Sequence, residues 1–531
     1  MPSNAAAVSM VWFRKGLRLH DNRALLEAIR NASFLIPLVV IDPFLVNPTR
    51  CGVRPLQFFL ECLQDLDRSL REKNSRLVVL TGDPVDIIPR YAQKWNVSKI
   101  FCETDTGRYG TVRDANVATA LAARSIQLVS YSGHTLYPIH DVRLAYGNRY
   151  PQRYEEFRQR VANIVIDDPR PSPEVLPPLP SVLPDSDASI PTLKGLGFDE
   201  ELKPTALVGG ETYALERLVK VMGDEDNIRM YSKQDTSPLD FEPASGTCLS
   251  PYIARGCLSV RLVRSHILKI LSKGREHTEP PRSLLGQLLW REFHYAASYL
   301  TPNIYEMDGN PMCKPIEWRK EPQELFQAWA DGRTGYPFID AAMIQLKQEG
   351  WIHNAARNAV ACFLTRGDLW IDWRLGRDLF EKYLIDSDTA LNNGGWLWQS
   401  GSAYLPNHFT PQNPITYAKK FNPDDGAYVR RYIPALKNMP TQFIYEPWKA
   451  PRHVQRKAGC IIGQDYPERI VIHEVESRVL TERMAAYHQK AKSSQSSSRS
   501  HGQNGQRRQH ITSLVGKKYT KRIENVQLNT S

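Results

Sequence analysis

The sequence contains no Cys-x-x-Cys pair and no uninterrupted apolar run of membrane-spanning length. Its eight cysteines are scattered, which argues against a disulfide framework, a zinc ribbon or an iron–sulfur cluster and favours reduced thiols inside a cell. Charged residues interrupt every candidate apolar segment, so we expect no membrane span. The N-terminus has no basic region ahead of an apolar core, and a secretory signal is not expected.

The turn after the first predicted strand also lacks a glycine-rich fingerprint. Residues 14–22 read Arg-Lys-Gly-Leu-Arg-Leu-His-Asp-Asn, not Gly-x-Gly-x-x-Gly. The glycines of that fingerprint let a pyrophosphate approach the start of a helix. We therefore do not expect NAD to bind at this sheet.

The basic charge of this 531-residue chain is concentrated near its C-terminal end. Of the formal net charge of +11, the segment from Lys490 onwards carries +8, because it contains nine lysines and arginines and one acid, Glu524. The body of the chain therefore carries +3, which is close to neutral. Net charge alone does not indicate a nucleic-acid-binding surface on that body.

The first 135 residues alternate β-branched or aromatic runs with amphipathic stretches. This rhythm predicts an α/β antenna-type domain over residues 8–135, built on a five-stranded, mostly parallel, doubly wound sheet. The expected strands are 10–13, 34–42, 76–81, 99–103 and 126–131. The expected helices are 22–31, 56–72, 84–95 and 110–124.

The rest of the chain divides by composition into three parts. Residues 136–204 are predicted to form a connector, dense in proline at 168–191, and residues 205–487 a large all-α domain. Residues 488–531 are rich in Ser, Gln, Asn, Lys and Arg and predict a flexible, disordered basic tail. The expected helices of the all-α domain are 209–222, 256–273, 281–299, 321–332, 336–349, 351–366 and 373–384.

Residues 386–398 combine two acids, two amides, a glycine pair and two tryptophans. A solvated loop rarely carries two tryptophans, and an apolar core does not accept Asp386, Asp388 and Asn392 without partners. The pair Gly394-Gly395 is expected to break the segment. This mixture indicates the wall of a cavity that binds a polar, planar, aromatic guest.

A helical segment near residue 290 places an amide, a flat ring, a cation and an imidazole on one face. These side chains are Gln287, Trp290, Arg291 and His294, and they suit a phosphorylated aromatic ligand. The alternative is an ordinary packed helix, with Trp290 in the core and Arg291 paired with an acid.

Two further segments carry candidate binding groups. On the expected helix 351–366, Arg357 is the predicted partner of Asp386 or Asp388, whether this pair is structural or functional. His353, considered alone, is more typical of a satisfied core residue. The turn Gly246–Tyr252 carries hydroxyls and free amides before a predicted helix, which suits either a phosphate cradle or an ordinary helix cap.

Taken in order, these segments resemble the cryptochrome/photolyase family. The phrase Thr365-Arg-Gly-Asp-Leu-Trp is similar to animal cryptochromes and (6-4) photolyases. The ordered match consists of Val11-Trp-Phe-Arg, Leu19-His-Asp-Asn, Leu249-Ser-Pro-Tyr, Trp290-Arg-Glu-Phe, Gly335-Tyr-Pro-Phe-Ile-Asp-Ala, Trp351-Ile-His-Asn, Asn392-Asn-Gly-Gly-Trp and Glu446-Pro-Trp-Lys-Ala-Pro.

The resemblance implies a helical domain that holds FAD in a bent conformation. Arg357 and Asp386 would form an ion pair beside the isoalloxazine ring, Asp388 would lie at the ring edge, and Asn392 would face N5. An antenna chromophore, folate or deazaflavin, is implied for the N-terminal domain. The cofactor-binding positions carried over are Tyr231, Thr247, Cys248, Leu249, Ser250, Gln287, Arg291, His294, Asn354, Arg357, Asp386, Asp388 and Asn392.

The resemblance also implies a chain of indoles that would carry an electron to the flavin. Its members would be Trp396, then Trp373, then Trp318, because a large π-system can lose an electron and pass the hole along. Core packing is the alternative for each ring, and spacing does not exclude it.

The residues do not match one branch of the family throughout. Asn354 and Asn358 stand where (6-4) photolyases carry histidines, and an amide cannot act as a general acid. Cyclobutane photolyases match Asn354 and the two rings, Trp290 and Trp398, that would sandwich a flipped dimer. If the protein is a photolyase, its substrate contacts would be Gln287, Trp290, Asn354 and Trp398.

The leading hypothesis is a blue-light photoreceptor that signals to transcription or circadian proteins. The second is a photolyase that acts on UV-damaged DNA, with cyclobutane dimers favoured over (6-4) lesions. The third is a light-independent transcriptional repressor or scaffold. The expected location is intracellular, in the nucleus, the cytoplasm or both, and the basic tail is a candidate nuclear-entry or DNA-affinity segment.

Overall fold

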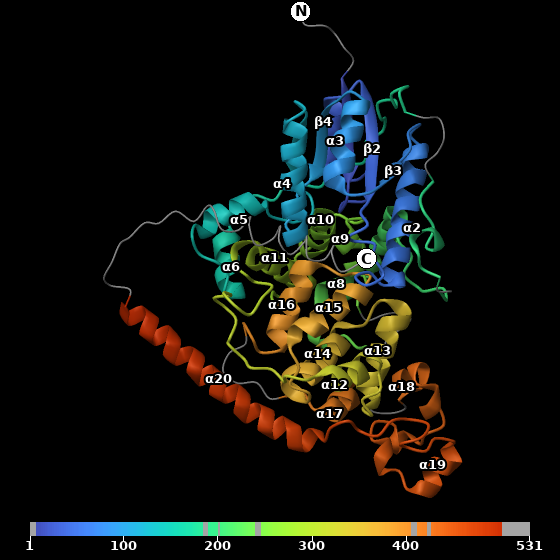
Figure 1. Cartoon of the computed structure of the whole chain (residues 1–531), viewed down its shortest axis with the longest axis vertical. Coiled ribbons are helices and arrows are strands. Elements are labelled where there is room, and N and C mark those ends of the chain that lie inside the picture. The colour runs from blue at the N-terminus through green and yellow to red at the C-terminus, as the bar shows by residue number, and fades with distance from the viewer. Residues whose placement is uncertain are drawn as a thin grey trace, which may run out of the picture. The chain divides into compact units, whose positions relative to one another are not determined.

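The N-terminal part of the computed structural model is a five-stranded parallel sheet (Figure 1). The model describes residues 7–183, 189–199, 202–238, 246–404, 411–421 and 426–501. The strand order is β3-β2-β1-β4-β5, with every pairing parallel, which confirms the predicted sheet. The strands are β1 (Val8–Phe13), β2 (Phe34–Ile41), β3 (Val78–Thr81), β4 (Val97–Glu103) and β5 (Gln127–Tyr131).

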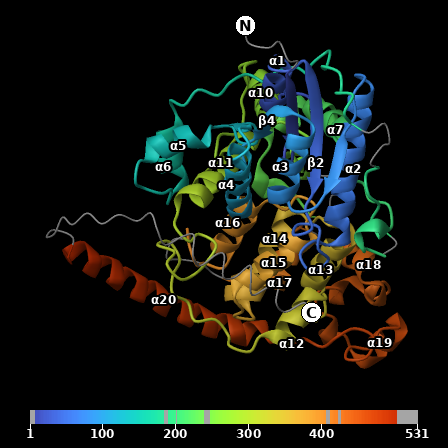
Figure 2. The ribbon, with the colours of Figure 1, turned by 45° about the horizontal axis from the view of Figure 1, so that its top comes forward.

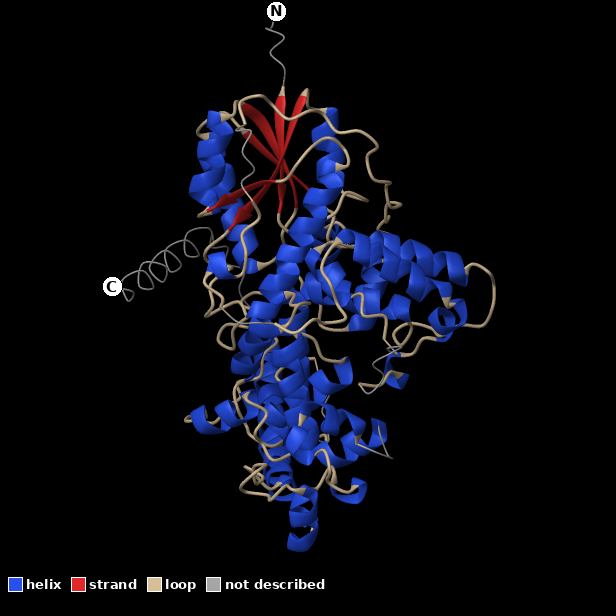
Figure 3. Ribbon diagram, turned by 90° about the vertical axis from the view of Figure 1, so that its right-hand side faces the viewer, coloured by secondary structure: helices blue, strands red, loops and turns tan. Residues whose placement is uncertain are grey.

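Alternating side chains of the central strand enter two different cores. Met10 and Trp12 of β1 pack in one hydrophobic cluster, whereas Val11 and Phe13 pack in another. This alternation follows from the two-residue period of a strand that is buried on both faces. Helices lie on both sides of the sheet (Figure 3). They are α1 (Arg23–Arg30), α2 (Val53–Arg71), α3 (Pro84–Lys94) and α4 (Arg108–Ala122).

The predicted connector contains two short helices, α5 (Ile139–Tyr146) and α6 (Tyr154–Val161). The apolar side chains of α6, namely Tyr154, Phe157 and Val161, are buried at intervals of three and four residues. That spacing is helical, but it spans only two turns and is too short to stand out in a proline-rich region. The proline-dense stretch 168–183 has no helix or strand, as expected.

The second half of the compact unit is helical, and all seven helices predicted there are present. Figure 1 shows α12 to α19 beyond the end of the sheet that is opposite the N-terminus, whereas Figure 2 shows α7 and α10 level with the sheet. The helices are α7 (Glu211–Gly223), α8 (Glu225–Met230), α9 (Ser250–Arg255), α10 (Val260–Leu271), α11 (Leu284–Leu300), α12 (Gln323–Ala330), α13 (Pro337–Glu349), α14 (Asn354–Cys362), α15 (Trp373–Tyr383), α16 (Thr389–Gln399), α17 (Pro414–Phe421), α18 (Ala427–Tyr432) and α19 (Arg452–Ala458).

The chain forms one compact unit to Met484 and a second unit from Ala485 onwards. The last helix, α20 (His473–His501), begins in the first unit, where Leu480 and Met484 are buried. Residues 488–501 of the predicted tail continue α20, and residues 502–531 lie outside the described part of the chain. Within that described part, no helix has both the length and the apolar character that a bilayer span requires. All eight cysteines are free thiols, as predicted.

Buried polar contacts join the sheet to the helical part. Arg18, in the turn after β1, donates to Glu103 (2.6 Å) and to the carbonyl of Gly256 (2.9 Å). Glu211, the first residue of α7, accepts from the backbone amides of Leu19 (2.7 Å) and His20 (2.9 Å) and pairs with the His20 ring. The turn after β1 is therefore held by partners that lie far away in the sequence.

Replacing Glu211 with alanine is expected to lower the free energy of unfolding by about 3 kcal/mol, because the amides of Leu19 and His20 lose a buried charged acceptor. Unfolding in urea, followed by circular dichroism, measures the change. Glu216→Ala on the exposed face of the same helix is the matched control, with an expected change within about 0.5 kcal/mol. Equal stability of the two variants would contradict the assigned role of Glu211.

Candidate functional site

A buried carboxylate and an arginine form the centre of the predicted cavity. Oδ2 of Asp386 accepts from Arg357 Nη2 (2.8 Å) and from Ser250 Oγ (2.7 Å). The predicted ion pair of Arg357 is confirmed, and its partner is Asp386 rather than Asp388. The second oxygen of Asp386, Oδ1, is buried without a hydrogen-bond partner. It is therefore free to accept from an N–H group of a guest.

The start of α14 is fixed by a histidine cap. Nδ1 of His353 accepts from the amide of Ala355 (3.1 Å), and Nε2 of His353 lies 3.0 Å from the hydroxyl of Thr236. Both ring nitrogens are thus engaged, which confirms His353 as a satisfied buried residue. The cap sets the first turn of α14, from which Asn354 and Arg357 project as half-buried side chains.

Asp388 is the N-cap of α16. Its Oδ1 accepts from the amides of Ala390 (3.1 Å) and Leu391 (3.2 Å), and its Oδ2 accepts from the hydroxyl of Tyr295. Burial alone would raise the pKa of Asp388, but the hydrogen bond and charge of His134 and the charge of Lys15 outweigh it and hold that pKa far below its usual value. The predicted place of Asp388 at a ring edge therefore competes with a structural role as a cap.

The expected break at Gly394-Gly395 does not occur, because α16 continues through both glycines. The cap at Asp388 supports the first turn of the helix. A Cβ on Gly394 would stand 2.2 Å from His294 Nδ1, whereas a Cβ on Gly395 would meet nothing within 4 Å. Gly394 permits close packing of α16 against α11, and Gly395 leaves open space beside Asn392.

His294 and Lys233 bring titratable groups to the predicted site. Nδ1 of His294 is buried without a partner, and burial together with the charge of Lys233 lowers the pKa of His294 to about 4. Burial and the charge of Arg357 lower the pKa of Lys233 to about 8. No described residue accepts a hydrogen bond from the Lys233 ammonium. The sequence did not single out Lys233, because a lysine in a short polar loop usually lies at the surface.

At neutral pH the His294 ring is expected to be uncharged, and its neutrality contributes to stability. Because the pKa falls from 6.5 in the unfolded chain to about 4 in the folded one, only the unfolded chain binds this proton between those values. The contribution, about 3 kcal/mol, is present above pH 6.5 and is lost as the pH falls towards 4.

Urea unfolding of the flavin-free protein and of His294→Gln across that interval tests this expectation. The difference in unfolding free energy between the two proteins should shrink on acidification, since glutamine does not titrate. A difference that stays constant would contradict it.

The predicted phosphate cradle is only partly assembled around the ion pair. Ser250 lies against Asp386, as described, and Arg217 Nε donates to the carbonyl of Thr247 (2.9 Å). Cys248 and Leu249 are buried, and Cys248 has a left-handed backbone with φ 49°. Tyr231 is half-buried just before a short 3₁₀ turn, Lys233–Asp235. The cradle and the ion pair thus meet at Ser250.

The side chains of the helical face predicted near residue 290 do not all point to one site in the structure. Gln287 Nε2 donates to the carbonyl of Pro281 (2.9 Å). Arg291 is buried, with Nη1 on Glu292 (2.8 Å) and Nη2 on the carbonyl of His134 (2.8 Å). The alternative reading, in which Arg291 pairs with an acid, therefore describes this residue. The long Arg291 side chain turns towards the loop after β5, which helical spacing alone does not reveal.

Trp290 and Trp398 do not form the predicted sandwich. Their ring centroids lie 5.6 Å apart with the planes at 85°, so the rings meet edge to face. One face of Trp290 is stacked on Tyr154 of α6 at 4.2 Å, and Trp398 is stacked on Tyr404 at 6.4 Å. The two indoles form a corner, which can receive a flat group against one wall but not between two parallel faces.

The three predicted chain tryptophans lie in one aromatic region. Trp396 and Trp373 are buried members of the same hydrophobic cluster, and the half-buried Trp318 packs against that cluster. Trp370 adds a fourth ring, 4.9 Å from Trp318 between centroids. The sequence alone does not connect Trp370 with these rings, because its proximity to Trp318 arises only in the fold.

Asn392 is oriented by the helix that carries Trp373. Its Nδ2 donates to the carbonyl of Arg377 (2.9 Å), and the Arg377 guanidinium lies over the Trp373 ring at 5.2 Å. The half-buried face of α16 that carries Asn392 also contains Gly395 and Trp398. That Asn392 faces the predicted guest stays a prediction.

The unpaired groups of this site fit a guest with both N–H and anionic groups. The free Oδ1 of Asp386 is an acceptor, and the Lys233 ammonium is a donor and a cation. A Cβ added at Gly246 or at Gly395 would meet no atom within 4 Å. Within the described ranges, no cluster of three His, Cys, Asp or Glu side chains could hold a metal ion.

Two family descriptions match the chain. "DNA photolyase" matches residues 9–178, and "FAD binding domain of DNA photolyase" matches residues 284–486. The (6-4)DNA photolyase of Arabidopsis thaliana is 41% identical over 490 residues, which cover 90% of this chain and 88% of that protein. Cryptochrome-1 of Erithacus rubecula is 41% identical over 485 residues, covering 90% and 78% respectively.

Solved structures show the same fold. The cryptochrome of Synechocystis superposes with a TM-score of 0.78 at 26% sequence identity, covering 90% of this chain and 99% of that one. The sequence and structural similarities extend over both the sheet and the helical part.

Proposed function

The chain belongs to the cryptochrome/photolyase family of FAD-binding flavoproteins, and from this we propose that it is a blue-light photoreceptor that signals through photoreduction of its flavin. The observation that carries the proposal is a group of four indoles: Trp396 and Trp373 are buried in one cluster, the half-buried Trp318 packs against that cluster, and the buried Trp370 lies 4.9 Å from Trp318 between ring centroids. Members with repair activity exist in the same family, so the proposal has to be tested against repair.

The residues that would hold FAD are those around the Arg357–Asp386 pair. Oδ1 of Asp386 would accept from the ring, Asn392 would face it from α16, and the ammonium of Lys233 would supply a positive charge. The other predicted contacts stay part of the proposal: Tyr231, Thr247, Cys248, Leu249, Ser250, Gln287, His294 and Asn354. When bound, FAD supplies absorption of blue light and accepts one electron.

The tryptophans would supply that electron. Trp396 lies against Phe380 (5.1 Å between centroids), and Gly376 leaves room for it, because a Cβ there would stand 2.2 Å from the Trp396 ring. The Nε1 atoms of Trp373 and Trp318 are buried without partners. Close packing of these rings should limit the reorganisation that accompanies a change in their charge, and the Arg377 guanidinium places a positive charge over the Trp373 ring.

Repair of cyclobutane dimers is the second candidate function, and the aromatic corner favours it. Trp290 and Trp398 offer two perpendicular walls for a flipped base. Repair of (6-4) lesions is disfavoured, because the amides of Asn354 and Asn358 cannot donate the proton that such repair needs.

A repair assay separates these functions. The flavin-loaded protein, chemically reduced, would be mixed with oligonucleotides that carry one cyclobutane dimer or one (6-4) lesion, in blue light and in darkness. The photoreceptor proposal expects a light-dependent change in flavin absorbance and no loss of either lesion. Light-dependent loss of the cyclobutane dimer would contradict the photoreceptor proposal and identify the protein as a cyclobutane-dimer photolyase.

The partners and the location belong to the same proposal. We propose signalling or transcription proteins as partners, residence in the nucleus, the cytoplasm or both, and an antenna chromophore of the folate or deazaflavin class. A light-independent repressor is the remaining alternative. Partner binding and repression that persist in the dark and after loss of FAD would identify it.

A further inference from the structure

A short basic helix, α19 (Arg452–Ala458), lies at the outer edge of the helical part. Figures 1 and 2 both show it far from the sheet. Its inner side is fixed by Gln455, which donates to the carbonyl of Ala450 (2.8 Å) and accepts from the amide of Ile462 (3.0 Å). Gln455 and Ala458 are buried, so the opposite side of the helix faces solvent.

The charged side chains on the solvent side of α19 and just ahead of it are all basic. This surface is called the α19 basic face, and its five exposed members are Lys449, Arg452, His453, Arg456 and Lys457. Lys449 pairs with Glu446 (2.6 Å). In the part of the chain that the structure describes, no carboxylate pairs with Arg452, Arg456 or Lys457. Most of the positive charge of this face is therefore not neutralised within the protein.

The arrangement of these charges is unfavourable for α19 itself. Arg452 and Arg456 are four residues apart on one helix surface, where two like charges destabilise the helix. Arg452 and His453 also lie in the first turn, which favours acids, and no acid is present there. Local conflicts of this kind are expected where a sequence serves binding rather than stability. The α19 basic face is therefore a candidate interaction surface.

Acidic side chains bound the α19 basic face along the chain. Glu446 precedes it, and the exposed Asp465 and Glu468 lie in the loop that follows, where Asp465 accepts from the amide of Ile461 (2.8 Å). The helix itself is only about 10 Å long. A long nucleic acid would have to carry its phosphates past these carboxylates, which would repel them. A short acidic segment fits between them.

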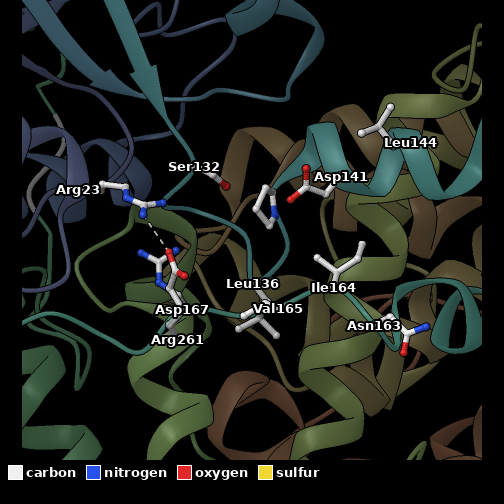
Figure 4. Close-up of a pocket in the computed structure, with 11 residues that line it drawn as sticks. Arg23, Ser132, Leu136, Asp141, Leu144, Asn163, Ile164, Val165, Asp167 and Arg261 are labelled. Atoms are coloured by element: carbon white, nitrogen blue, oxygen red, sulfur yellow. Dashed lines mark ion pairs between the residues drawn. The ribbon is translucent and has the colours of Figure 1, made fainter.

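The surroundings of the α19 basic face favour neither a membrane nor a small molecule as its partner. Among the described residues, no large hydrophobic side chain between positions 447 and 464 is exposed. A helix that binds a membrane surface presents an apolar face together with its cations. The cavity of about 570 Å³ beside the carboxyl end of β5 (Figure 4) takes no side chain from this part of the chain.

We infer that the α19 basic face binds an acidic helical segment of a partner protein, with carboxylates one helical turn apart. Glutamates at positions i and i+4 of such a segment have the same spacing as Arg452 and Arg456, so each guanidinium can meet one carboxylate. Binding would also offset the repulsion within α19. The inference goes beyond the photoreceptor proposal and does not rest on flavin chemistry.

The probe is a fluorescently labelled, alanine-rich helical peptide with glutamate at every fourth position, titrated with the full chain and followed by fluorescence anisotropy. The expected dissociation constant is on the order of 100 μM at low salt, because exposed ion pairs are individually weak. Affinity should fall about tenfold when the salt concentration rises from about 0.05 M to about 0.5 M. The same peptide with glutamine in place of glutamate should not bind measurably, and equal affinities of the two peptides would overturn the inference.

A double variant locates the binding. Arg452→Gln/Arg456→Gln should weaken binding of the glutamate peptide about tenfold. Arg90→Gln/Lys94→Gln is the matched control, because Arg90 and Lys94 are also exposed cations four residues apart, on α3. This control should bind the peptide as the wild type does. Equal weakening in the two double variants would show attraction by net charge alone and would overturn the inference.

Arg452→Glu separates binding from stability. The substitution places a carboxylate in the first turn of α19 and one turn before Arg456, so hydrogen exchange of the α19 amides should slow about twofold. Peptide binding should nevertheless fall about tenfold or more, because a cation of the surface becomes an anion. Faster exchange would contradict the repulsion within α19, and retained binding would contradict the docking role.

An undamaged single-stranded oligonucleotide of the same length as the peptide tests the other anionic partner. Its affinity should be the same for the wild type and for Arg452→Gln/Arg456→Gln. Binding of the oligonucleotide that is tighter than that of the peptide and is lost in the double variant would identify nucleic acid as the partner and overturn the inference. None of these outcomes bears on flavin photoreduction.

Discussion

Trp396→Phe is expected to slow photoreduction of the flavin by about 100-fold or more, equivalent to about 3 kcal/mol in activation free energy. Phenylalanine fills most of the space of the indole between Phe380 and Gly376, but a phenyl ring gives up an electron far less readily. Transient absorption after a laser flash, with an external reductant present, measures the rate. Flavin content should stay unchanged, because Trp396 is not among the groups that would hold the cofactor.

Trp95→Phe is the matched control for this substitution. Trp95 is buried to a similar degree, in the hydrophobic cluster of the sheet, and lies outside the group of four indoles. Its replacement should leave the rate of photoreduction within about twofold, while its effect on stability resembles that of Trp396→Phe. Equal rates in the two variants would show that electrons reach the flavin by another route.

The second large effect is expected for Asp386→Asn, which should weaken FAD binding by about 100-fold, equivalent to about 3 kcal/mol. The amide of asparagine has the size of the carboxylate, but it carries no negative charge to pair with Arg357. It also has one oxygen fewer to accept hydrogen bonds from Arg357 and Ser250. Equilibrium dialysis of FAD against the flavin-free protein measures the dissociation constant.

Asp372→Asn is the control for loss of an aspartate–arginine pair. Asp372 caps α15 and pairs with Arg374 (2.7 Å), away from the flavin site. FAD affinity should not change in this variant. If both variants bind FAD as the wild type does, the cofactor is held elsewhere. If Asp386→Asn loses FAD yet still represses transcription, the scaffold alternative replaces photoreception.

The sheet and its helices could be predicted because their signals are local. β1 and β2 are short β-branched runs between turns, and the buried residues of α2 recur at helical spacing. Such patterns need no knowledge of distant partners. The same holds in part for the Arg357–Asp386 pair, since a buried carboxylate requires a cationic partner, although only the fold selects Asp386 over Asp388.

Features that depend on long-range packing could not be predicted. Gly394-Gly395 appeared to break a helix, and only the ring of His294 against Gly394 explains why glycine is there. Arg291 shares a helical face with His294 by spacing, yet it turns to a loop more than 150 residues earlier in the chain. The pKa of Lys233 is lowered by Arg357, and Lys233 in turn lowers the pKa of His294. These residues are far apart in the sequence and come close together only in the fold.

The turn after β1 is synthesised long before the residues that contact it in the folded protein. Arg18, His20 and Asp21 emerge from the ribosome early, but Glu211, Gly256 and Arg261 follow about 190–240 residues later, which at about 5–20 residues per second is a delay of about 10–50 seconds. During that interval the sheet has to carry solvated charges where the mature protein has buried pairs. We therefore expect a truncated N-terminal fragment to bind chaperones rather than to fold on its own.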